Sequence, residues 1–211
     1  MTSADSSDKI IYLNGGDLRY SPVQDIIELY ETPEGRANSL MPLDELLMGS
    51  LGRNDVSDRI KLANYFFDKG ADASYVENGD GVNCLHVLLG RWEHDYEREA
   101  PLLGRLLDEG ANINQRGGKF GYPMEMVRYL SSLGGDRNFF YDELFSRSGI
   151  DFGVVINRHS GAILADMYLG LPPAMAGLQK RAEDYIAQHG LHGDGRPPFV
   201  CPPVSERVGK D

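Results

Sequence analysis

The sequence predicts an all-α protein in which pairs of helices repeat along the chain. The first observation is a recurring glycine, found at Gly70, Gly110, Gly149 and Gly190, with intervals of 40, 39 and 41 residues. The second is an amphipathic run before each of these glycines, and the third is a shorter apolar run further upstream. Because one such unit cannot bury its apolar face alone, we expect neighbouring units to stack into a short solenoid.

The longer helix of each unit is predicted from apolar residues at helical spacing. The positions with shared offsets are Leu62, Ala63, Phe66 and Phe67 in one copy and Leu102, Leu103, Leu106 and Leu107 in the next. The third and fourth copies match in part, with apolar faces at Phe140, Leu144 and Phe145 and at Ala182, Tyr185 and Ile186. A glycine just past such a run is expected at the helix end, because it adopts the left-handed conformation without a Cβ penalty.

A shorter helix is expected before each longer one. Its equivalent positions are Leu43, Leu85, Met124 and Leu164, at intervals of 42, 39 and 40 residues. Another apolar residue follows three positions later in every copy, which is one turn along the same helix face. Each unit is therefore predicted to contain a short helix, a connector, a longer helix and a polar loop.

These patterns predict three regions. The first is an N-terminal segment, residues 1–38, with a capping helix over residues 22–30 that starts at Pro22. The second is a repeat region, residues 39–190, whose units are expected at 39–78, 79–114, 119–153 and 159–190. The third is a Pro-rich tail, residues 191–211, which we expect to be extended or disordered. The alternative is that Phe199 and Val200 dock on the last repeat or on a partner.

Two stretches of the second unit resemble the ankyrin repeat. Residues 81–89 (GVNCLHVLL) resemble its Gly-x-Thr-Pro-Leu-His opening, and residues 106–114 (LLDEGANIN) resemble its Leu-Leu-x-x-Gly-Ala-Asp-Val-Asn ending. The resemblance implies an ankyrin-like solenoid that binds proteins with its loop tips and first helices. It also implies a structural role for His86, which should hydrogen-bond to loop backbone.

The sequence departs from the ankyrin pattern in three ways. The period is about 40 residues instead of the family's roughly 33, and the excess falls in connectors such as residues 90–100. Asn83 and Cys84 stand where the family has Thr-Pro. The third and fourth units lack most of the signature, so they are included on spacing more than on identity.

Composition limits the kind of partner. The chain carries a net charge of −11 over 211 residues, which argues against nucleic acids and anionic membranes because phosphates repel such a surface. The same charge would speed encounter with a basic protein, although it equally suits a merely soluble surface. The two cysteines and the polar start without a secretion signal favour a reducing cytoplasm. We expect a monomer.

No motif for catalysis, cofactors or metals is found. His189 and His192 lack further ligands with tetrahedral spacing. The pairs Gly15-Gly16 and Gly117-Gly118 do not match phosphate-binding loops and are interpreted as turns. Most carboxylates alternate with Lys and Arg on presumed outer helix faces, as on a solvated surface.

The sequence therefore favours a non-catalytic module that binds a specific protein. The candidate contacts lie in loop tips and in one connector: Tyr75, Glu77, Asp80, Arg116 and Phe120, then Trp92 and Tyr96. For Trp92 and Tyr96 the alternative is that they cover the neighbouring repeat's core. A sharper hypothesis is a bacterial immunity or antitoxin protein; effectors and eukaryotic adaptors stay open. The competing class is an enzyme or small-ligand protein with a pocket in the third and fourth units, near Arg158, His159 and Asp166.

Overall fold

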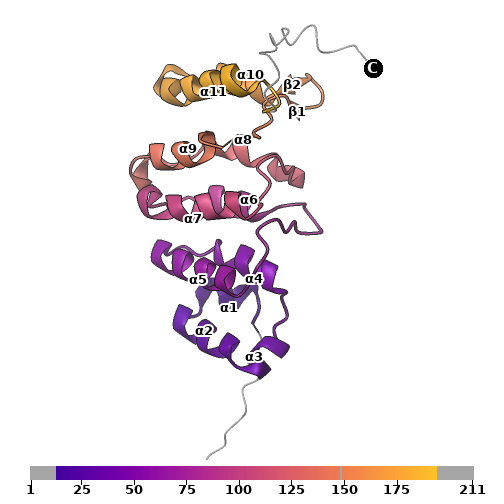
Figure 1. Ribbon diagram of the computed structural model, residues 1–211, viewed down its shortest axis with the longest axis vertical. Helices are drawn as coiled ribbons and strands as arrows, with labels where there is room; N and C mark the ends of the chain where they lie inside the picture. Colours follow the sequence, from indigo (N-terminus) through magenta and orange to yellow (C-terminus); the bar gives the residue numbers. More distant parts are fainter. Residues whose placement is uncertain (1–12, 148, 194–211) are drawn as a thin grey trace, which may run out of the picture. The chain divides into compact units, whose positions relative to one another are not determined.

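The computed structural model describes residues 13–147 and 149–193. This part of the chain is mostly helical, with 57% helix, eleven α-helices and a small two-stranded sheet. The all-α prediction therefore holds for the bulk of the chain, and the hairpin is an addition to it. The chain divides into two compact units, Met1–Asp72 and Ala73–Asp211, coloured indigo to purple and purple to yellow in Figure 1.

The first unit holds five helices. They are α1 (Gly15–Tyr20), α2 (Val23–Glu31), α3 (Pro33–Ala37), α4 (Leu43–Ser50) and α5 (Val56–Asp68). The expected capping helix is α2, with Pro22 just before its first residue. The interpretation of Gly15 and Gly16 as a turn is wrong, because both lie in the first turn of α1. There the Asn14 side chain accepts hydrogen bonds from the backbone N–H groups of Gly16 and Asp17, which caps the helix.

A buried arginine pair joins the helices of the first unit. The fully buried Arg59 donates two hydrogen bonds, of 2.9 and 2.7 Å, to the carbonyl of Arg53. Arg53 in turn donates to the carbonyl oxygens of Leu18 and Ser21 and to the carboxylate of Asp58. These bonds tie the end of α1 to the start of α5. Backbone carbonyls satisfy most donors of these buried guanidinium groups, which makes their burial tolerable, although Arg53 Nε has no partner among the described residues.

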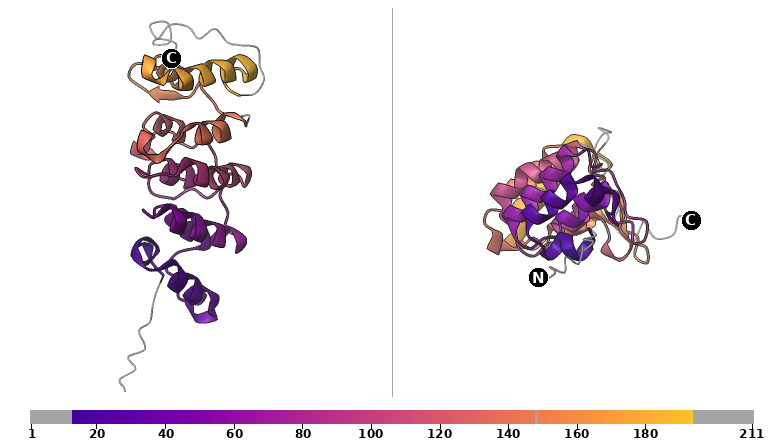
Figure 2. Two further views of the ribbon diagram at one scale, coloured as in Figure 1. Left: turned by 90° about the vertical axis from the view of Figure 1, so that its left-hand side faces the viewer. Right: turned by 90° about the horizontal axis from the view of Figure 1, so that it is seen from below.

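The second unit holds three helix pairs, each a shorter helix followed by a longer one. They are α6 (Cys84–Leu89) with α7 (Tyr96–Asp108), α8 (Pro123–Val127) with α9 (Asn138–Phe145), and α10 (Leu164–Leu169) with α11 (Ala176–His189). Within this unit α7, α9 and α11 lie in successive layers, and α6 packs against α8. The same layering appears from the side in Figure 2.

Short elements complete the second unit. They are the 3₁₀ turns η1 (Gly118–Phe120), η2 (Ser132–Gly134) and η3 (Pro173–Met175) and the antiparallel strands β1 (Val155–Asn157) and β2 (Ala162–Ile163). The pair Gly117-Gly118 forms part of a tight turn closed by a bridge from Gly117 to Gly121, as the sequence predicts. We call the segment inside a helix pair a connector and the segment between pairs a loop.

The recurring glycines have the predicted conformation. Gly70, Gly110, Gly149 and Gly190 all have positive φ, between +75° and +104°. Gly110 follows α7 directly after its C-cap, and the next N–H, that of Ala111, returns to the carbonyl of Leu106. Most residues of the predicted apolar faces are buried, whereas Leu107, Phe145 and Ile186 are half-buried. The fully buried members are Leu62, Ala63, Phe66, Leu103, Leu106, Phe140 and Ala182.

Side chains also join consecutive helix pairs of the second unit. The Tyr96 hydroxyl donates to the carbonyl of Ser131 at 2.6 Å, and the Tyr168 hydroxyl to that of Met124 at 2.8 Å. At the loop bases, Asn114 donates to the carbonyl of Gly149 and accepts from the N–H of Asp151. These bonds satisfy buried polar groups and fix the register between layers. Phe199 and Val200, expected in the tail, lie outside the described residues.

Candidate functional site

The loops at residues 75–82 and 115–121 pack against each other. The N–H of Gly118 donates to the carbonyl of Asp80 at 2.6 Å. The Gln115 side chain donates to the carbonyl of Gly81 at 3.1 Å. Five of the predicted contact residues therefore belong to one surface that is built from these two loops. We call it the loop surface; its predicted members are Tyr75, Glu77, Asp80, Arg116 and Phe120.

Exposure differs among these members. Asp80, Arg116 and Phe120 are exposed, whereas Tyr75 and Glu77 are half-buried. The Glu77 carboxylate accepts the N–H groups of Gly79 and Asp80 at 2.6 and 2.7 Å, so it shapes its own loop.

The charges on the loop surface are mixed. Lys119 lies over the ring of Phe120, with its Nζ 5.2 Å from the ring centroid. The surface therefore offers Asp80 of one sign, Arg116 and Lys119 of the other, and one partly exposed ring.

His86 supports this surface from below. Its Nδ1 lies 2.8 Å from the Asn83 side chain, and its Nε2 lies 3.1 Å from the carbonyl oxygen of Gly121. Asn83 and His86 together form a capping box at the start of α6. Burial lowers the pKa of His86, although the contact with Gly121 acts in the opposite direction. The predicted structural role of His86 is confirmed.

The two remaining candidate contacts, at the connector between α6 and α7, differ in their exposure to solvent. Trp92 is 71% exposed, whereas Tyr96 is fully buried as the first residue of α7. The ring of Tyr96 lies between His94 and Phe140, with centroid distances of 5.1 and 4.9 Å. Tyr96 is therefore not a candidate contact. For this residue the alternative prediction, that it covers the core of the neighbouring repeat, is confirmed.

The next connector adds exposed apolar side chains that the sequence argument missed. Tyr129 and Leu133, on residues 128–137, are 68% and 85% exposed. The two connectors touch, because a Cβ placed on Gly134 would lie 2.6 Å from the carbonyl oxygen of His94. We call Trp92, Tyr129 and Leu133 the connector surface. The available signal was an apolar residue placed after the end of a short helix, outside the helical periodicity.

A second correction concerns the carboxylates. Carboxylates are predicted to alternate with Lys and Arg on outer helix faces, but Glu99 is fully buried. Its Oε2 lies 2.9 Å from Nδ1 of His94 and accepts the N–H of Asp95 at 3.0 Å. Glu99 thus holds the connector that carries Trp92 onto α7.

The residues proposed for the competing pocket occupy structural or exposed positions. Arg158 and His159 lie exposed in the turn between β1 and β2. Asp166 accepts the N–H of Ile163 at 2.9 Å and caps α10. His192 pairs with Asp151 at 2.9 Å, and the His189 ring packs on Tyr185.

Residues 13–147 and 149–193 show neither a membrane-spanning helix nor a metal-binding cluster. Every helix there is too short or too polar to traverse a lipid bilayer. In the same residues no three His, Cys, Asp or Glu side chains are arranged to hold a metal ion. Comparisons with protein-family models, with curated proteins and with solved structures gave no match.

Proposed function

We propose that this chain is an ankyrin-like repeat protein that binds another protein, without catalysis, through its connector surface and its loop surface. The exposure of Trp92, Tyr129 and Leu133 is the observation that carries the proposal. All three lie on two connectors that approach each other at His94 and Gly134. Exposed apolar side chains that gather on a protein surface commonly mark an interaction site. Tryptophan and tyrosine are also among the residues that contribute most to binding energy.

The backbone that carries these side chains is held in place, which favours binding. The Tyr96 hydroxyl, at the start of α7, donates to the carbonyl of Ser131 in the second connector. Gly134 of the same connector lies close against the His94 carbonyl. A rigid surface loses less conformational entropy when a partner docks. The connectors exceed the usual ankyrin length, so their role in binding is the feature that would set this protein apart from the family pattern.

Ion pairs join successive helix pairs of the second unit, which supports a stacked arrangement. Asp108 of α7 pairs with Arg147, two residues past the end of α9, and Asp142 of α9 pairs with Arg181 of α11. The capping box of His86 supports the ankyrin resemblance at the start of α6. In a stack of repeats each unit contacts its neighbours, and both ion pairs are contacts of that kind.

The net charge of −11 favours a basic partner. A bacterial immunity or antitoxin protein that neutralises a basic toxin fits this charge and a scaffold devoted to binding. An effector or adaptor role would fit the same scaffold, because fold does not determine function.

The test is a pull-down from source cells with the full tagged chain. A double variant, Trp92→Ala with Leu133→Ser, removes two of the three apolar side chains of the connector surface. Tyr20→Ala is the matched control, because Tyr20 is an aromatic residue 76% exposed in the other unit. We expect one stoichiometric protein with the wild type and the control, lost with the double variant and weakened at higher salt. Retention by the double variant, or capture of no stoichiometric protein, would contradict the proposal.

A further inference from the structure

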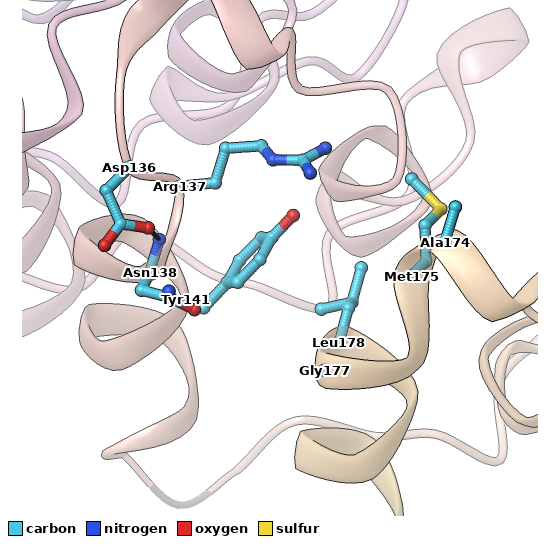
Figure 3. A pocket seen from close by; sticks show the side chains of 8 residues that line it. All are labelled: Asp136, Arg137, Asn138, Tyr141, Ala174, Met175, Gly177 and Leu178. Carbon is cyan, nitrogen blue, oxygen red and sulfur yellow. Dashed lines mark hydrogen bonds between the residues drawn. The ribbon is translucent and has the colours of Figure 1, made fainter.

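A small cavity of about 150 Å³ lies within the second unit, between the start of α9 and the turn from η3 into α11 (Figure 3). Its two walls differ in chemistry. The α11 side presents the apolar side chains of Met175 and Leu178. The α9 side is polar and is lined by Asp136, Arg137, Asn138 and Tyr141.

The hydroxyl of Tyr141 points into this cavity (Figure 3). Tyr141 is only 6% exposed, yet its hydroxyl has no hydrogen-bond partner among the described residues. The other buried tyrosines of this unit differ, since Tyr96, Tyr168 and Tyr185 each donate to or accept from backbone at 2.6–2.8 Å. The Tyr141 oxygen is reached from the cavity, so it is free to bond a molecule that enters there.

Arg137 extends its guanidinium toward the same space (Figure 3). Its recorded bond is a long one, 3.3 Å, to the carbonyl of Leu130. Within residues 13–147 and 149–193 it has no carboxylate partner, in contrast to Arg147 and Arg181. The nearby Asp136 carboxylate accepts the N–H of Asn138 at 2.9 Å. One positive charge therefore faces the cavity without an ion pair in the described chain.

Burial raises the pKa of Tyr141, so its hydroxyl stays protonated and available as a donor. A guanidinium and a phenol hydroxyl both offer hydrogens, and an anionic oxygen pair accepts from both. A cavity of this volume can hold about six non-hydrogen atoms, judged from an engineered cavity of similar size that binds benzene. The apolar wall suits the remaining carbon atoms.

We propose that this cavity binds a carboxylate carried on a short aliphatic chain, with Arg137 and Tyr141 as donors and with Met175 and Leu178 against the chain. The cavity borders the second connector, because Asp136 and Arg137 end that connector and Arg137 donates to the carbonyl of Leu130. The proposal rests on the cavity's own lining and does not depend on the proposed protein-binding function. The carboxylate can belong to a free short-chain acid or to a glutamate side chain of a polypeptide, and the experiment separates these two sources.

The experiment is an NMR titration of the full ¹⁵N-labelled chain with butyrate and, as a neutral control, butyramide. We expect saturable shifts with butyrate at amides of residues 136–141 and 174–178, and none with butyramide. Arg137→Gln should weaken butyrate binding about tenfold or more, and Tyr141→Phe should weaken it several-fold, because each removes one donor to an anion. Arg158→Gln, an exposed arginine in the same unit, is the matched control and should bind as the wild type does.

Two further titrations identify the source of the carboxylate. Stronger binding of butyrate than of acetyl-glutamate amide indicates a free acid, and the reverse order indicates a polypeptide side chain; either result supports the site. Four results overturn it: no saturable shift, equal binding of butyramide, unchanged affinity in both cavity variants, or tighter binding of inorganic phosphate. Tyr141→Phe deletes a single oxygen atom, so a spectrum that matches the wild type will show that this variant is folded.

Discussion

Nδ1 of His94 and Oε2 of Glu99 lie 2.9 Å apart, and both side chains are fully excluded from solvent. The His94 ring also stacks on Tyr96 and meets Phe140 edge-on, with centroids 5.1 and 5.2 Å apart. This polar pair therefore sits inside an aromatic cluster that joins α7 to α9. It fixes the connector that exposes Trp92.

The first prediction follows from this pair. Glu99→Ala should lower the free energy of unfolding by about 3–5 kcal/mol, because it leaves a buried histidine and the N–H of Asp95 without their acceptor. Glu97→Ala, on an exposed position two residues earlier, should change it by less than about 0.5 kcal/mol. Urea denaturation measures both. Equal, small effects would show that the pair contributes little to folding.

The sequence predicts the parts of this fold that depend on local spacing. Phe66 and Leu106 lie on helix faces whose periodicity is visible over a dozen residues, and Gly110 ends its helix for a local reason. Glu99 and Arg59 are buried against groups only four to six residues away, in the segments that precede α7 and α5. Their burial depends on how those segments fold back, which helical spacing does not predict.

The candidate site was predicted less completely than the core. Trp92 is exposed, but Tyr96, four residues away, is buried because α7 begins at Tyr96 and turns it inward. Tyr129 and Leu133 follow no helical period, so the search for periodic faces passed over them; their signal was an apolar residue beyond the end of a short helix. The cavity beside Tyr141 depends on two segments almost 40 residues apart in the chain, which only the folded arrangement brings together.

The second prediction tests the core faces. Phe66→Ala and Leu106→Ala should each cost about 2–5 kcal/mol, because both side chains are fully buried and truncation leaves a cavity. Leu133→Ala is the control, since Leu133 is 85% exposed. Thermal or urea unfolding of the three variants gives the comparison. An unchanged unfolding transition for either core variant would mean that its helix face is misassigned.

The third prediction concerns two glycines of opposite conformation. Gly110 has φ of +101°, so Gly110→Ala should cost about 1–2 kcal/mol in backbone strain. Gly177 lies within α11, and a Cβ there would meet no atom within 4 Å. Gly177→Ala should therefore stabilise the protein by about 0.4–1 kcal/mol through the entropy of the unfolded chain. The same sign for both substitutions, measured by urea denaturation, would refute the assignment of Gly110 as a helix-ending residue.

The fourth prediction is a pH dependence. Burial lowers the pKa of His86 below its ordinary value of 6.5 in the folded state. As the pH falls through about 6.5, the unfolded chain takes up a proton that folded His86 does not, so the unfolded state is favoured and stability declines. We expect a lower urea midpoint at about pH 5.5 than at about pH 7.5.

Two histidine variants assign this effect. His86→Gln should reduce the decline, even though it also weakens the protein at neutral pH by removing the capping box. His159→Gln should leave the decline unchanged, because His159 is exposed in the β1–β2 turn. A decline of wild-type size in His86→Gln would place the responsible proton elsewhere.

The fifth prediction uses Trp92, the single tryptophan of the chain, as a reporter. Because it is 71% exposed, its fluorescence in the free protein should be that of a hydrated indole and should be quenched readily by acrylamide. A partner that docks on the connector surface must cover the indole, so the emission should move to shorter wavelength and quenching should fall. Leu133→Ser, which leaves the indole in place, should weaken the partner and restore quenching at a given partner concentration. Full quenching with partner bound would place the interface away from the connectors, and binding would then have to be sought on the loop surface around Arg116 and Phe120.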